Sequence, residues 1–76
     1  MLGNTLKEHM RERGIKQVFV AEKAGISPQV LGTILNEQRK IEAAEFFKIC
    51  EAAAADPIEI AKRACIYQPP AKETIA

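Results

Sequence analysis

The side chains best suited to recognising another molecule lie between residues 27 and 36. Gln29, Thr33 and Asn36 recur at helical spacing, so they share the outer face of one predicted helix. Amide and hydroxyl groups at such positions hydrogen-bond to base edges. The chain lacks a nucleophile–base pair, a glycine-rich phosphate loop and a metal cluster, which argues against an enzyme. We therefore expect this face to enter a DNA groove.

Two short helices joined by a tight turn position this face. The spacing predicts helices over 17–24 and from about 28 to 36, with Gly25 leaving the first helix at a positive φ. Ser27 as N-cap and Pro28 at the first helical position are a strong start signal. Apolar or small residues form the inner face of this helix-turn-helix: Val20, Ala21, Ala24, Ile26, Leu31 and Ile34.

A first helix is predicted to begin at Thr5, where Thr5 and Glu8 match a capping box, and to end at Gly14 with Leu6 and Met10 facing inward. A fourth helix is expected from 42 to about 54 or 55. Its predicted buried stripe, with the two phenylalanines as the largest core residues, is Ala43, Phe46, Phe47, Cys50, Ala53 and Ala54.

A fifth helix is predicted behind Asp56 and Pro57, ending before the prolines at 69 and 70. Its expected inward residues are Ile58, Ala61, Cys65 and Ile66. The fold class is therefore all-α, with one domain over 1–66 and a flexible C-terminal tail over 67–76.

Composition narrows the class of protein. With 47% apolar and 28% charged residues, the chain is globular rather than disordered. It has neither a membrane-length apolar run nor a signal-peptide core, so we expect a cytoplasmic protein without membrane contact. Cys50 and Cys65 form no CxxC pair and His9 is the single histidine, so we expect no metal and no cofactor.

Charge is distributed unevenly along the chain. Residues 1–40 carry seven Lys and Arg against four Glu, a net of +3, whereas residues 41–76 carry a net of −2. The predicted DNA-reading half is thus the basic half. Because the excess is small, one copy should grip phosphates weakly, which favours a homodimer acting on one duplex.

Two features leave alternatives open. His9 beside the apolar stripe of the first helix is either a half-exposed helix residue or a phosphate contact or pH switch. Val18 and Phe19 fall on the outer side of the second helix. They either pack on the first or fourth helix or form a patch that contacts a partner.

From about Thr5 to Ile60 the chain resembles the lambda-repressor and Cro-like helix-turn-helix proteins, the XRE family of transcriptional regulators. The resemblance rests on a series of residues in register, followed by a short basic loop and an apolar helix: Gln17, Ala21, Gly25, Ile26, Ser27, Leu31, Ile34, Asn36, Asp56, Pro57 and Ile58. It implies a compact five-helix domain. The chain departs from the family at Glu37, where Gly is common, and at Lys16, where a small N-cap is usual.

The resemblance also assigns roles. The positions expected to face base edges are Ser27, Pro28, Gln29, Gly32 and Thr33. Those expected at the DNA backbone are Gln17, Asn36, Arg39 and Lys40. Apart from the resemblance, we also expect Lys16 at the DNA backbone. Gln29 is the best candidate for direct reading, since its amide can pair with adenine through two hydrogen bonds.

We therefore expect a sequence-specific DNA-binding regulator, a phage- or mobile-element-type repressor that binds a palindromic operator as a homodimer. Ile66 and Tyr67 are the predicted dimer or partner surface. The alternative is a protein-interaction module, such as an antitoxin whose C-terminal tail docks on a partner protein.

Overall fold

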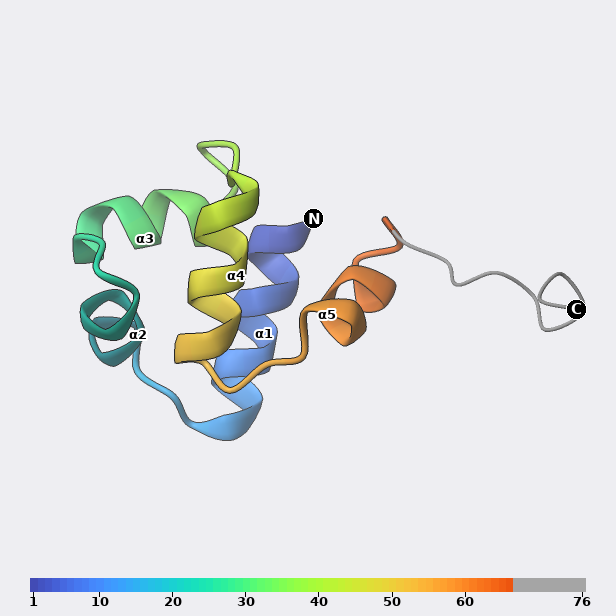
Figure 1. Cartoon of the computed structure of the whole chain (residues 1–76), viewed down its shortest axis with the longest axis horizontal. Coiled ribbons are helices and arrows are strands. Elements are labelled where there is room, and N and C mark those ends of the chain that lie inside the picture. Colours follow the sequence, from blue (N-terminus) through green and yellow to red (C-terminus); the bar gives the residue numbers. More distant parts are fainter. Residues whose placement is uncertain (67–76) are drawn as a thin grey trace, which may run out of the picture.

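The computed structural model describes residues 1–66, and over these residues the chain is all-α, with five helices and no strand. The helices are α1 (Leu2–Arg13), α2 (Gln17–Ala24), α3 (Pro28–Leu35), α4 (Ala43–Ala52) and α5 (Pro57–Arg63). The α4 helix packs against α2 and α5, α1 packs against α3 and α5, and α2 packs against α3. The α2–α3 pair and α5 lie at opposite sides of the molecule (Figure 1).

The inner face of the α2–α3 pair lies in the core, as the sequence predicts. Its buried members are Val20, Ala21, Ala24, Leu31 and Ile34, and Ile26 is half-buried against them. Leu6 and Met10 of α1 complete this core from the other side. Burial of each of the larger side chains contributes about 1.5–3 kcal/mol to stability. This shared core fixes the angle between α2 and α3.

The start of α1 differs from the prediction. The helix begins at Leu2, and Thr5 is a buried residue inside it whose hydroxyl donates to the carbonyl oxygen of Met1 at 2.8 Å. The predicted capping box of Thr5 with Glu8 is therefore wrong. The backbone N–H of Asn4 instead donates to Oε2 of Glu37 at 2.9 Å. The predicted end of the helix is confirmed, since Gly14 adopts φ 67°.

The buried stripe of α4 also differs. Phe47 is 57% exposed and Phe46 only half-buried, so neither belongs to the largest core residues. Ala43 and Ala54 are exposed as well. Ile49 and Cys50 are the fully buried residues of the helix, because α4 turns them toward the core. Ala52 and Ala53 continue the buried surface as α4 ends.

The predicted cap of α5 is confirmed, but its buried face is not. Oδ1 of Asp56 accepts from the backbone N–H of Ile58 at 3.0 Å. Ile60 and Ala64, four residues apart, are the buried pair, whereas Ile58 is exposed. Cys65 and Ile66 are also exposed and lie beyond the end of the helix, and Ala61 is half-buried. The helix is too short to carry the longer inward stripe that the sequence predicted.

His9 is buried, at 6% exposure, rather than half-exposed. Its Nε2 lies 3.1 Å from the carbonyl oxygen of Ala53, and since a carbonyl only accepts, the ring N–H donates. This bond ties α1 to the end of α4 and leaves no surface for a phosphate contact. Cys50 is also buried, and this burial raises the pKa of its thiol to about 11. It packs as a small apolar residue.

Within residues 1–66, no helix combines the length and the apolar character that crossing a lipid bilayer requires. The predicted partner residue Tyr67 and the predicted tail over 67–76 lie outside the described residues.

Candidate nucleic-acid interface

The turn between α2 and α3 is held by glycine and by backbone hydrogen bonds. Gly25 adopts φ 74°, a left-handed conformation that glycine accepts without steric cost. The N–H of Ile26 then donates back to the carbonyl oxygen of Ala21 at 3.0 Å. Because Ala21 is small and fully buried, the two helices can cross closely. The turn therefore gives α3 one fixed direction relative to α2.

The start of α3 follows the predicted chemistry. Oγ of Ser27 accepts from the backbone N–H of Val30 at 3.1 Å, and Pro28 occupies the first helical position. Ser27, Pro28 and Gln29 are exposed, so this end of α3 projects from the domain. Three of the predicted base-reading residues thus lie together at this end of α3.

The outward face of α3 is polar but not charged. Gln29 is exposed, and within residues 1–66 its side-chain amide makes no hydrogen bond. Thr33 is half-buried, and its hydroxyl donates to the carbonyl oxygen of Val30 at 2.7 Å. The Thr33 proton is therefore used inside the helix. Gln29 remains the side chain with both a donor and an acceptor free to bind.

Gly32 leaves the middle of this face bare. A Cβ at this position would meet no heavy atom within 4 Å, so no packing inside the domain demands glycine here. Its φ is not positive either, so the backbone does not require glycine. What glycine provides at this position is a helix surface that another molecule can approach closely.

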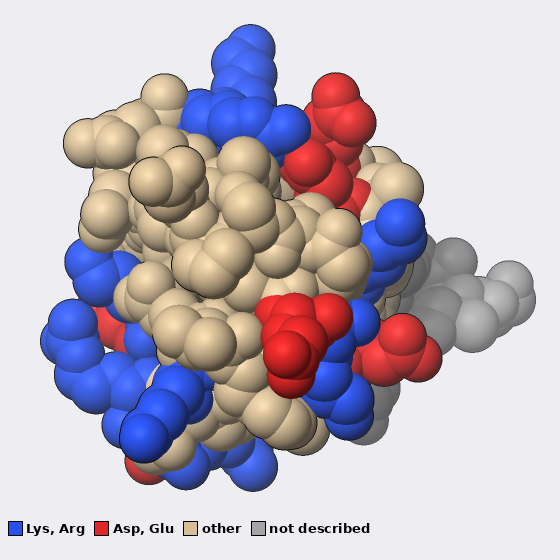
Figure 2. Space-filling model, turned by 90° about the vertical axis from the view of Figure 1, so that its left-hand side faces the viewer, with Lys and Arg blue, Asp and Glu red and all other residues tan. Residues whose placement is uncertain are grey.

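The predicted backbone contacts come from two segments, one at the start of α2 and one after the end of α3. Lys16 and Gln17 lie at the start of α2, and Asn36, Arg39 and Lys40 follow the end of α3; all are exposed. Figure 2 views the side of the molecule that carries α2 and α3. It shows a broad surface without charge, with Lys and Arg at its margins and Asp or Glu side chains at its upper right and in its lower part. A neutral face with cations beside it is compatible with a reading helix whose neighbours contact phosphates.

Two of these flanking residues already have partners. Oδ1 of Asn36 accepts from Nζ of Lys7 at 2.8 Å, which links α1 to the end of α3. Arg39 donates from Nη1 and Nη2 to the two carboxylate oxygens of Glu45 at 2.9 and 2.8 Å. Lys16 and Lys40 have no ion-pair partner among residues 1–66. Sequence reasoning missed Glu45, because an acid six residues from an arginine is not a recognisable signal.

The contacts of Glu37 account for an acid at a position where the family commonly has glycine. It adopts φ 60°, the conformation for which glycine is the usual choice. Its carboxylate faces α1, where it accepts from the N–H of Asn4 and pairs with the N-terminal amine of Met1. The hydrogen bond from the N-terminal amine, followed by that from Asn4, lowers the pKa of the Glu37 carboxyl group. The acid thus holds the first turn of α1 against the end of α3.

Lys16 is the N-cap of α2, at a position where the family usually has a small residue. Its side chain makes no hydrogen bond that caps the helix. Its ammonium group is therefore not engaged in closing the helix. The neighbouring Gln17 begins α2 at the surface.

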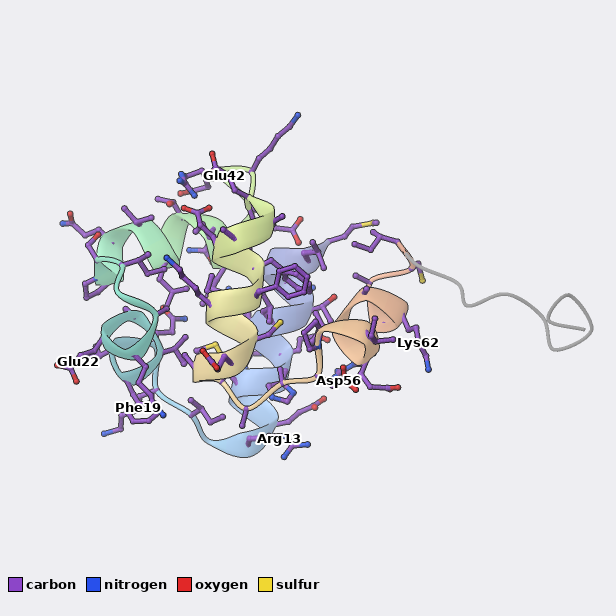
Figure 3. All side chains as sticks on the ribbon, in the orientation of Figure 1. Arg13, Phe19, Glu22, Glu42, Asp56 and Lys62 are labelled. Atoms are coloured by element: carbon purple, nitrogen blue, oxygen red, sulfur yellow. The ribbon has the colours of Figure 1, made fainter. Side chains whose placement is uncertain are left out.

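Val18 and Phe19 do not pack on α1 or α4, since they are 64% and 50% exposed. Nζ of Lys23 lies 5.5 Å from the centre of the Phe19 ring, which is a cation–π contact at the surface. Figure 3 shows Phe19 and Glu22 on the outer side of α2, far in this view from Lys62 on α5. The second alternative, a patch that contacts a partner, stays a prediction.

Comparison with known proteins agrees with this geometry. The HTH_3 helix-turn-helix family model matches residues 6–60. The clp gene regulator ClgR from C. glutamicum has a similar structure, with a TM-score of 0.81 and 20% identity over 84% of this chain and 83% of that chain. The restriction-modification controller protein C.AhdI from Aeromonas hydrophila gives 0.72 and 24% identity over 78% of this chain and 89% of that chain. No curated protein sequence matches the chain.

At these identities the two solved structures establish the fold. The family model covers most of the chain, including α2, the turn and α3. The chain therefore belongs to the XRE family of helix-turn-helix DNA-binding domains.

Proposed function

We propose that this domain is a sequence-specific transcription regulator that places α3 in the major groove of DNA. The observation that carries the proposal is the neutral, hydrogen-bonding face of α3, with the exposed Lys40 in the loop after it and the exposed Lys16 before α2. The family membership supports it, and the two similar structures are described as a gene regulator and a controller protein.

In this proposal Gln29 is the principal base reader. It lies in the exposed first turn of α3, and its free amide can pair with the N6 and N7 atoms of adenine. Thr33 offers its methyl group to a thymine, because its hydroxyl proton is bonded within the helix. Each good base contact discriminates by about 1–3 kcal/mol. Ser27, Pro28 and Gly32 complete the surface that approaches the bases.

The ends of the motif hold the DNA backbone. Lys16 and Gln17 approach a phosphate at the start of α2, and Asn36 and Lys40 approach another after α3. Such contacts position the reading helix and make binding strongly dependent on salt.

Because the net charge of one copy is only +1, we propose that the protein binds a palindromic operator as a homodimer, with its reading helices about 34 Å apart. Exposed apolar side chains outside α3 favour such an interface: Phe47, Ile58 and the predicted Ile66, which lines a surface pocket beside Ile34 and the loop after α3, are each at least half exposed. Tyr67, the other predicted contact, continues the chain from Ile66. A repressor of a phage or mobile element is the type of regulator that this design fits best.

The alternative function is a protein-interaction module such as an antitoxin, with the chain beyond Ile66 docking on a partner protein. The exposed Val18 and Phe19 on α2 favour it, because apolar side chains gathered at a surface mark contact sites.

Selection from a random duplex pool tests the proposal. Purified protein at micromolar concentration and low salt should retain duplexes and enrich a two-fold symmetric sequence. Gln29→Ala should still retain DNA but lose preference at one position in each half-site. Gln38→Ala removes the same side chain from the exposed loop after α3 and should leave the preference unchanged.

If the wild-type protein retains no duplex at low salt, the regulator proposal is wrong. Co-purification of a second protein that is released when the chain is cut after Ile66 would then support the antitoxin.

A further inference from the structure

The two cations in the loop after α3 are in different chemical situations. Arg39 makes a two-armed ion pair with Glu45, whose Oε1 also accepts from the backbone N–H of Glu42 at 3.1 Å. Glu45 is the third residue of α4, so this carboxylate closes the start of that helix. Lys40 is exposed and has no ion-pair partner within residues 1–66.

The Arg39–Glu45 pair is well fixed. Parallel N–H···O bonds of 2.9 and 2.8 Å are the strongest geometry available to these two groups. The Glu45 side chain is only 17% exposed, because the helix start and the guanidinium cover it. The hydrogen bond from Arg39, followed by that from Glu42, lowers the pKa of Glu45 to about 2. The carboxylate is therefore charged wherever DNA binding is measured.

This pairing has a consequence at the DNA backbone. The salt dependence of binding counts the cations that replace counterions at phosphates. Arg39 and Glu45 together carry no net charge. Because their side chains are hydrogen-bonded to each other, a phosphate that reaches the guanidinium also approaches the carboxylate. The repulsion from Glu45 offsets the attraction to Arg39, since both charges lie within one hydrogen bond of each other.

We propose that Glu45 is a positioning residue that holds Arg39 on α4 and prevents it from neutralising a DNA phosphate, so that Lys40 is the effective cation of this loop. This inference rests on the proposed function. In this proposal Arg39 lies at the interface and connects the loop to α4 through its ion pair with Glu45. It also predicts that affinity for the backbone is restrained by one acid rather than limited by a shortage of basic residues.

The test measures the dissociation constant for one duplex as a function of salt for five proteins. Lys40→Ala should reduce the magnitude of the slope of log Kobs against log salt by about 0.9. Glu45→Gln should increase it by about 0.9, because the freed Arg39 now counts as a cation. That change alone alters the loss of affinity between 50 and 200 mM salt by about 3.5-fold. The double variant R39A/E45Q should have the wild-type slope.

Glu51→Gln is the matched control, since Glu51 is an exposed acid on α4 that makes no ion pair within residues 1–66. Thermal unfolding of every variant checks that each is folded at the temperature of the titration. The proposal is overturned if the slope for R39A/E45Q is smaller in magnitude than that of the wild type by about 0.9, or if Glu51→Gln increases the slope as much as Glu45→Gln. Failure of the proposed function is distinct, because the wild-type protein would then bind no duplex at low salt.

Discussion

Gly32 gives a prediction in which stability and DNA binding change in opposite directions. Glycine inside a helix costs about 0.5–1 kcal/mol relative to alanine. At Gly32 a methyl group would enter open space, and the backbone does not adopt a positive φ. Gly32→Ala should therefore raise the free energy of unfolding by about 0.5–1 kcal/mol, which is a rise of about 2–8 °C in Tm for a domain of this size.

The same methyl group should weaken DNA binding. It points away from the domain, on the face that we propose lies against the bases. Adding a methyl group to a packed contact costs about 1–3 kcal/mol. A cost of about 1.4 kcal/mol weakens Kd about tenfold. Circular dichroism melts and fluorescence anisotropy with a labelled duplex, measured on the same sample, give both quantities.

Gly14→Ala is the control. Its Cβ would also enter open space, but φ at Gly14 is 67°, so alanine is strained and the protein should lose stability. Gly14 lies at the end of α1, outside the proposed interface, so the affinity of the folded protein should not change. A Gly32→Ala protein that is more stable and binds DNA as tightly as the wild type would refute the close approach of α3 to the bases.

Three further predictions concern the scaffold. Gly3→Ala should lower the free energy of unfolding by about 1–3 kcal/mol in urea titrations, because a Cβ would overlap the carbonyl oxygen of Ile34; a neutral effect would show that α1 and α3 do not approach so closely. His9→Ala should cost about 1–3 kcal/mol in the same assay, since it removes the buried donor to Ala53, and an unchanged midpoint would contradict that bond. The pKa of Glu45 is lowered to about 2, so its stabilising contribution is present above the unfolded value near 4.5 and is lost as pH falls toward 2. Stability measured from pH 6 to 2 should therefore fall less steeply for Glu45→Gln, and parallel curves would count against the ion pair.

Most local signals predict the structure correctly, and the capping box of Thr5 with Glu8 is the exception. Gly25, Ser27 with Pro28, and Asp56 with Pro57 act through φ or through hydrogen bonds within three residues, so each needs only its neighbours to specify it. The inner face of α2 and α3 was also predictable, because its apolar spacing is unambiguous.

Long-range features could not be predicted in this way. The first turn of α1 is closed by Glu37, which lies 33 residues away in the chain. Of two adjacent phenylalanines, only Phe46 turns toward the core, and the sequence does not say how far α4 rotates. The inward face of α5 depends in the same way on how a seven-residue helix docks, which places Ile60 rather than Ile58 inside.

For the candidate site, the sequence predicted which side chains are exposed on and around α3, but not what they are bonded to. The partner of Arg39 lies across the start of another helix, and Lys7 reaches Asn36 from α1. Such pairs depend on the packing angles between helices rather than on spacing. The roles of the exposed residues at DNA stay predictions.

The most direct test of the central claim is an NMR titration of the ¹⁵N-labelled protein with the duplex selected from the random pool. The account predicts that the largest amide shifts fall on residues 27–33, with a second group at 16–17 and 36–40, and that α5 changes little on binding. Shifts concentrated on α4 and α5, with α3 unchanged, would contradict the claim that α3 is the reading helix.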